Sequence, residues 1–190
     1  IIMTVKITKP ELNLREKISE LDYSKVPYEK MPAGSVVQTQ FTILTGSGTA
    51  NEAETTSSTY QQTNHTVTIS PKFKNSIIRI DMAPNTKQNS GTAYQTLAIY
   101  KNIAGGGWEF GTTFAFGSTV STAPHGAGTI RHNGTATTWN IHPILFFDRP
   151  GTTETIEYRL FQRNSSNGAF TVRVGENGAD EFCSATEIKQ

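Results

Sequence analysis

The chain has little of several features on which whole classes of function depend. Its 190 residues include one cysteine, Cys183, so an internal disulfide and a zinc-binding Cys-x-x-Cys pair are both excluded. No run of about 18 apolar residues occurs, so no membrane-spanning helix is expected. The opening "IIMTVKITKP" lacks the apolar core and cleavage site of a secretory signal, so none is expected either. We therefore predict no membrane partner.

Charge is also scarce. Charged residues make up 17% of the chain, against about a quarter in a typical soluble domain. The net charge is +1, which leaves no basic excess to neutralise the phosphates of a nucleic acid. We therefore predict no nucleic-acid partner.

Threonine and serine are abundant instead, at about a fifth of the residues, together with 16 glycines. Threonine is β-branched and suits a pleated, half-hydrated surface. Stretches of alternating apolar and polar residues follow one another, separated by turn residues, and "TETIEYRLFQRNSSNGAFTVRVG" (153–175) is typical of a hairpin. The other alternating stretches are 35–44, 65–71, 75–84, 91–102, 105–117, 138–151 and 182–189.

About eight strands with almost no helical periodicity predict an all-β protein: a jelly-roll-like antiparallel β-sandwich over residues 34–190. Within 91–102 the apolar parity shifts, which suggests a bulge near Thr96.

Residues 1–33 differ from the rest, because they are rich in charge and contain no glycine before Gly34. Leu14, Ile18 and Leu21 recur at helical spacing, which predicts a short helix from Pro10 or Leu14 to Leu21. Two or three turns are marginal alone in water, so the helix must dock on something. Pro27 and Pro32 then stiffen a linker. We expect an anchoring arm whose partner-binding residues are Leu12, Leu14, Ile18 and Leu21.

The sequence offers few candidate functional residues, and no catalytic, cofactor-binding or metal-binding residue is predicted. A metal site needs converging ligands, and the surroundings of His125 and His132 supply no Asp, Glu or Cys. A third histidine, His142, falls inside a strand, where a hydrogen-bonded structural role is commoner. Cys183 in "FCSATEI" is interpreted as a small core residue on the last strand rather than a reactive thiol.

The carboxylates give no acid–base pair. Asp81 is predicted to point outward from its strand, and Asp148 in "DRPG" is typical of turn chemistry. Glu109 lies between Trp108 and Phe110, where an exposed acid beside aromatic rings could bind sugar. The commoner alternative is a solvent-facing strand residue opposite two core rings. We predict no enzyme.

Two regions resemble proteins of tailed phages. The start, "MTVKITKPELNLREKISELD", resembles small structural proteins of marine phages, in which a "KP…NLREK…EL" segment recurs. The segments "TTSSTYQQTNHTVTISPKFKNSIIRIDM" and "FFDRPGTTETIEYRLFQRNSSNGAFTVRV" resemble a β module of phage virion proteins, found in capsid decoration and tail fibre proteins. The Trp108 and Phe-rich middle departs from that module, so its central loops are not carried over.

The resemblance implies a virion protein that is assembled in the host cytoplasm, is homotrimeric and binds a major capsid protein or a tail or portal component. The first hypothesis is a non-enzymatic capsid decoration or cement protein held by the arm. The alternative is a tail fibre tip or adhesin that binds host surface glycan through the loops 45–63 and 126–137. A glycan hydrolase ranks third, because paired carboxylates are lacking.

Overall fold

The fold is described by a computed structural model. It covers residues 27–45, 52–89, 94–110, 129–131, 139–141, 143–164, 171–175 and 180–190. These residues contain thirteen strands and one turn of 3-10 helix, η1 (Tyr28–Lys30). No helix among them is long and apolar enough to cross a membrane.

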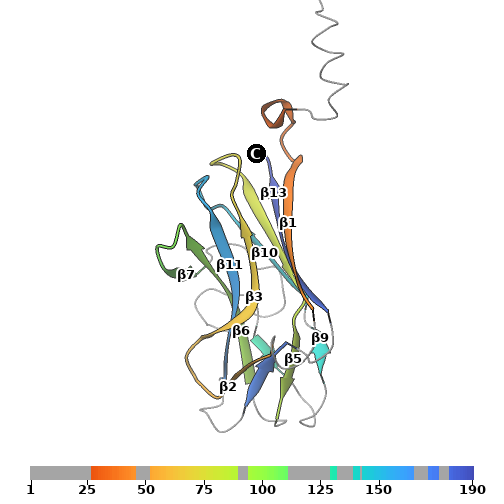
Figure 1. The fold of residues 1–190 in the computed structure, drawn as a ribbon, viewed down its shortest axis with the longest axis vertical. Coiled ribbons are helices and arrows are strands. Elements are labelled where there is room, and N and C mark those ends of the chain that lie inside the picture. Colours follow the sequence, from red (N-terminus) through yellow and green to blue (C-terminus); the bar gives the residue numbers. More distant parts are fainter. Residues whose placement is uncertain are drawn as a thin grey trace, which may run out of the picture.

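Two antiparallel sheets face each other and enclose the core (Figure 1). The first has the strand order β1 (Val36–Leu44), β13 (Glu181–Ile188), β4 (Ile77–Met82) and β10 (Ile144–Asp148). The second has the order β3 (Gln61–Ile69), β11 (Ile156–Asn164), β6 (Tyr94–Ile103) and β7 (Trp108–Phe110), and β8 (Thr129–Arg131) also pairs with β6. A third, smaller sheet lies at the lower end of Figure 1 and contains β2 (Ala53–Thr55), β12 (Val172–Val174), β5 (Asn85–Gln88) and β9 (Asn140–Ile141).

The chain passes back and forth between the two large sheets: β3, β6 and β11 belong to one, while β4, β10 and β13 belong to the other. This alternation is jelly-roll-like, so the predicted all-β sandwich is confirmed. The strands outnumber the eight expected for two reasons. The predicted strand at 138–151 is divided at Pro143 into β9 and β10, and β2, β5 and β8 lie outside the predicted strands. Pro84 likewise separates β4 from β5. Proline has no N–H for a strand ladder, which explains both breaks.

The core is built by the alternation that the sequence shows. In β4 the side chains of Ile78, Ile80 and Met82 are buried, while Arg79 is exposed and Asp81 points outward, as predicted. Each fully buried aliphatic side chain contributes about 1.5–3 kcal/mol. The buried core cluster consists of Val67, Ile69, Ile78, Ile80, Met82, Leu97, Ile99, Phe146, Ile156, Tyr158, Leu160, Val174, Cys183 and Ala185.

The predicted bulge near Thr96 is wrong. Strand β6 pairs with β11 in unbroken register from Gln95 to Ile103. Residues 95–99 are all buried, so apolar residues on either face of β6 are covered and the parity shift needs no bulge. The second sheet is bulged elsewhere, where three residues of β3 (63–65) lie opposite the single residue Leu160.

Asp148 is a core residue, so its interpretation as a turn residue is also wrong. It ends β10 with 1% of its surface exposed and accepts hydrogen bonds from the ammonium of Lys101, at 3.1 and 3.2 Å, and from the hydroxyl of Tyr158, at 2.9 Å. Burial, and secondarily the charge of Asp148, raises the pKa of the Tyr158 phenol. The carboxylate therefore ties β10 to β6 and β11 through one lysine and one neutral tyrosine.

A second buried carboxylate, Glu187 on β13, fixes the turn between β3 and β4. It accepts hydrogen bonds from the backbone N–H groups of Lys72 (2.8 and 2.9 Å) and Phe73 (3.0 Å) and from the hydroxyl of Ser76 (2.7 Å). The amide of Gln38 on β1 donates a further bond at 2.7 Å. Because each donor is directed at a charged acceptor, these bonds are stronger than neutral ones.

Candidate interaction surfaces

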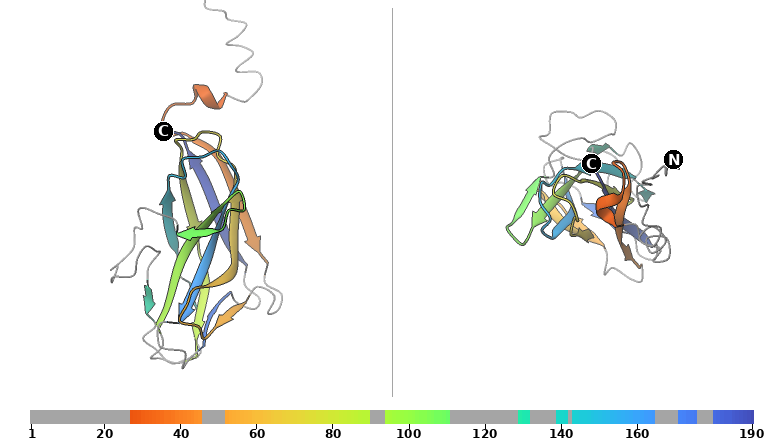
Figure 2. Two further views of the ribbon diagram at one scale, coloured as in Figure 1. Left: turned by 90° about the vertical axis from the view of Figure 1, so that its left-hand side faces the viewer. Right: turned by 90° about the horizontal axis from the view of Figure 1, so that it is seen from above.

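The four residues predicted to bind a partner through the arm, Leu12, Leu14, Ile18 and Leu21, lie outside the described residues. The described part begins at Pro27, and η1 and the C-terminus lie at the same end of the sandwich (Figure 2). The ammonium of Lys189 donates hydrogen bonds to the carbonyl oxygens of Tyr28 (3.1 Å), Glu29 (2.7 Å) and Met31 (2.7 Å). Lys189 therefore holds residues 28–31 against the end of the sandwich.

The outer face of the first large sheet is apolar at one end. Phe41 and Ile43 on β1 expose 69% and 54% of their surface, and Phe182 on β13 exposes 49%. Ile43 and Phe182 are cross-strand partners, and Phe41 lies two residues along the same face. We call these three residues the apolar patch. Scattered exposed apolar residues are ordinary, but a contiguous group marks an interaction surface.

The rest of that face is neutral. The next cross-strand pair that points outward is Thr39 and Thr186, whose hydroxyls lie 3.2 Å apart. Arg79 and Asp81 on β4 neutralise each other through an ion pair of 2.9 Å. A partner that covers this face therefore meets apolar and uncharged groups and needs no net charge of its own.

The outer face of the second large sheet carries a different surface. Aromatic rings and two guanidinium groups contact one another in sequence across β11, β6 and β7 and the residue before β3. This aromatic–arginine row consists of Arg163, Tyr60, Tyr100, Phe161, Trp108 and Arg159.

The spacing of the row is that of close ring contacts. The ring centroids lie 5.8 Å apart for Tyr60–Tyr100, 4.2 Å for Tyr100–Phe161 and 5.3 Å for Phe161–Trp108. Phe161 is the buried member of the row, whereas the two tyrosines and Trp108 are half-buried. Burial raises the pKa of Tyr100 to about 12, with the nearby Tyr60 adding to the shift and Arg163 opposing it. At neutral pH the phenol of Tyr100 is therefore uncharged.

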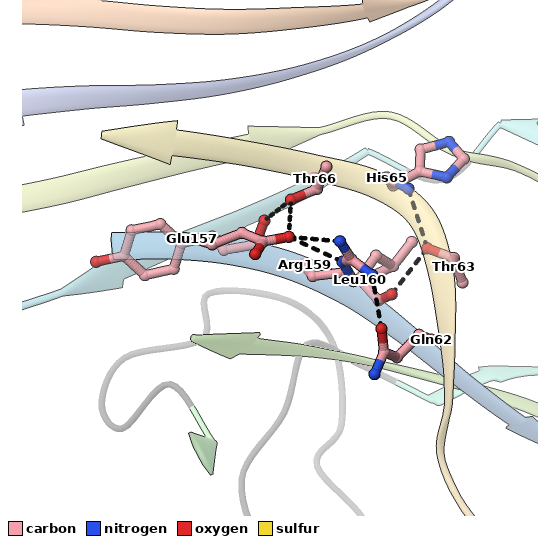
Figure 3. Close-up of polar contacts among 8 residues, drawn as sticks. Gln62, Thr63, His65, Thr66, Glu157, Arg159 and Leu160 are labelled. Carbon is pink, nitrogen blue, oxygen red and sulfur yellow. Dashed lines mark hydrogen bonds and ion pairs between the residues drawn. The ribbon is translucent and has the colours of Figure 1, made fainter. Parts of the chain in front are cut away.

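The guanidinium groups end the row. Arg163 lies 4.8 Å from the Tyr60 ring centroid and Arg159 lies 5.1 Å from that of Trp108, both within range of a cation–π interaction. Arg159 also pairs with Glu157 at 2.5 Å and donates a bond of 2.6 Å to Gln62 (Figure 3).

The bulge in β3 places Gln62 on this outer face. The Thr63 hydroxyl donates a bond of 2.7 Å to the carbonyl oxygen of Leu160 and accepts one of 3.2 Å from the N–H of His65 (Figure 3). Because β3 has two more residues than β11 at this bulge, Gln62 and His65 point in different directions. Gln62 contacts Arg159 on the outer face, and His65 is directed into the protein. Bulges often redirect side chains near functional surfaces.

Other residues with reactive side chains take structural or solvent-facing positions. His65 is fully buried, and its Nε2 lies 2.7 Å from Glu181, a carboxylate that also accepts the backbone N–H of Asn85. Cys183 is buried on β13, as predicted, and burial, aided by the charge of Glu181, raises the pKa of its thiol to about 12. Glu109 is exposed on β7. Within the described ranges no group of three or more His, Cys, Asp or Glu side chains could hold a metal ion.

The other predicted sites are only partly described. His125, His132 and His142 lie outside the described residues, and so does most of the predicted contact loop at 126–137. Trp108, expected to be a core ring beside Glu109, lies half-buried on the outer face instead. The aromatic–arginine row could not be predicted from the sequence, because its members come from separate strands. Only the register between those strands brings the side chains together.

No family model matches this chain, and no curated protein matches it. Among solved structures, it is similar to a chain in "Structure of infectious bursal disease virus Gt strain", with a TM-score of 0.37 and 14% sequence identity. The match covers 88% of this chain and 42% of that chain. This chain therefore corresponds to less than half of the viral chain's length.

Proposed function

We propose that this chain is a non-enzymatic structural protein of a phage particle, a capsid decoration or cement protein that assembles as a homotrimer and is held on the particle by residues 1–33. The observation that carries the proposal is the apolar patch, because Phe41, Ile43 and Phe182 expose apolar surface that a protein contact would bury. The sequence resemblance to phage virion modules supports the particle as the place of assembly.

The patch fits a contact between copies of this chain. It is apolar, and the face around it is neutral, so the patches of three copies can gather around a threefold axis without like charges being opposed. Burying such residues contributes about 25 cal/mol per Å² of apolar surface. Threefold assembly would cover the face in each copy.

The buried carboxylates support a scaffold role. Asp148, Glu181 and Glu187 all accept hydrogen bonds from groups on other strands or turns. Each therefore serves to join elements of the sandwich, as in a protein whose task is to hold its shape.

The arm supplies the link to the particle. Ordering it costs about 1–2 kcal/mol per residue, and burying Leu14, Ile18 and Leu21 returns about 1.5–3 kcal/mol each, so a single arm is a weak tether. The three arms of a trimer would leave from equivalent ends of their sandwiches and bind by avidity.

Antibodies raised against residues 34–190 test the proposal on purified particles. Immunogold label over the head is expected. Label at the tail tip instead would support the adhesin alternative, and protein that is found free in the lysate and never on particles would refute the structural role.

A further inference from the structure

Arg163 is a cation without a carboxylate partner among the described residues. Two other arginines, by contrast, are paired: Arg159 with Glu157, and Arg173 with Glu52 and Glu54. The guanidinium of Arg163 instead lies over the ring of Tyr60, and its Nε is buried without a hydrogen-bond acceptor in the part of the chain that the structure describes. Buried donors of this kind are rare in folded proteins and call for an acceptor.

The groups beside Arg163 suit a flat ligand. Tyr60, Tyr100 and Trp108 are half-buried, so each presents part of an aromatic ring on the outer face of the sheet. Gln62 lies exposed next to Arg159 and adds an amide to the polar groups of the row. Aromatic surface flanked by hydrogen-bonding groups is typical of sites that bind a ligand with both apolar and polar faces.

We infer that the aromatic–arginine row binds an acidic carbohydrate chain, whose carboxylate pairs with Arg163 while the C–H faces of its sugar rings lie against Tyr60, Tyr100 and Trp108. A guanidinium binds a carboxylate through two parallel N–H bonds, and the phenols stay uncharged at neutral pH and do not repel the anion. Sugar rings combine apolar faces with hydroxyl groups, which matches the mixture of rings, guanidinium and amide in the row.

The contrast with the opposite face favours carbohydrate over protein. There, Phe41, Ile43 and Phe182 are about half exposed or more and have no polar group on the side chain, which suits burial by another protein. In the row the one ring without a polar atom, that of Phe161, is only 6% exposed, and the more exposed side chains all carry a polar group. Carbohydrate binding by the row is separate from the proposed assembly role. That role is tested by the location of the protein on particles and by its mass in solution, and it would stand if the row bound no carbohydrate.

Calorimetric titration of the full-length chain tests the site with three probes of similar length. These are a hexamer of galacturonic acid, neutral maltohexaose and a hexaglutamate peptide, all at 150 mM salt. The acidic sugar is expected to bind saturably and to change the emission of Trp108 in a Trp139→Phe background. Arg163→Gln should weaken that binding about tenfold or more. Arg163→Lys should weaken it less, because the lysine keeps the positive charge but cannot donate two parallel N–H bonds to a carboxylate.

Arg79→Gln is the matched control, because it removes one exposed arginine from the opposite sheet, and it should leave binding unchanged. Tyr60→Ala should weaken binding while Arg163 remains. Thermal unfolding of each variant checks that the fold is intact. Equal losses in Arg163→Gln and Arg79→Gln, binding of hexaglutamate as tight as that of the sugar, or no binding of the acidic sugar would each overturn the inference.

Discussion

The ammonium of Lys189, the penultimate residue, lies 2.7 Å from the carbonyl oxygen of Met31, at the end of η1. The same ammonium also lies 5.1 Å from the ring centroid of Phe73. Lys189 thus holds residues 28–31 against the end of the sandwich, although the two segments are far apart in sequence.

Lys189→Met should loosen the contact between η1 and the end of the sandwich. The substitution removes three hydrogen bonds to carbonyl oxygens but keeps the length of the side chain. The amide protons of Lys30 and Met31, which bond to Pro27 and Tyr28, should then exchange with solvent several-fold faster. Lys74→Met, at an exposed turn position, should leave these rates unchanged. Unaltered exchange in Lys189→Met would show that η1 holds itself in place.

The buried pair of Lys101 and Asp148 should be costly to break from one side. Lys101→Met leaves a buried carboxylate without its cation and should lower the free energy of unfolding by about 3–5 kcal/mol. Adding Asp148→Asn removes that charge and should restore part of the loss. Urea denaturation measures both variants, and a loss under about 1 kcal/mol in Lys101→Met would contradict the buried ion pair.

Cys183 should be inert in the folded protein. Its thiol, whose ordinary pKa is 9.0, has a folded pKa of about 12. The protonated form is therefore favoured by folding, and the stability that this provides is full below pH 9 and is lost as the pH rises from 9 towards 12. A thiol reagent at pH 8 should label the protein only in denaturant. Cys183→Ala should flatten the alkaline decline by up to about 1.4 kcal/mol per pH unit.

The arm can be tested without disturbing the β domain. Leu14→Asp with Ile18→Asp should leave the domain folded but remove the protein from particles, because two charges replace the apolar residues expected to dock. Asn13→Asp with Ser19→Asp adds the same charge at polar positions and should incorporate normally. Quantitative mass spectrometry of purified particles gives the copy number of each variant. Equal copy numbers would show that residues 14 and 18 do not anchor the chain.

Alternation along the sequence predicted the sandwich because each strand reports its own buried face. Ile78, Ile80 and Met82 are buried and Asp81 points outward as that alternation requires. Where both faces of a strand are buried, as at residues 95–99, apolar and polar residues no longer alternate. The shifted pattern then suggests a bulge that the strand does not have.

The polar interior could not be predicted in the same way. Glu187 receives a hydrogen bond from Gln38, 149 residues away, and Asp148 receives one from Lys101. Each of these pairs depends on which strands are neighbours, and that information is not local. The aromatic–arginine row is of the same kind, because Trp108 reaches Phe161 only through the order β11-β6-β7.

The mass of the purified full-length chain in solution tests the central claim, that the outer face around the apolar patch joins copies of this protein. Sedimentation equilibrium should give three times 20.8 kDa for the unaltered chain and 20.8 kDa for Phe41→Glu. Gln40→Glu, which adds the same charge at the adjacent exposed residue of β1, should stay trimeric. A monomer at high concentration for the unaltered chain, or a trimer that Phe41→Glu leaves intact, would contradict the account.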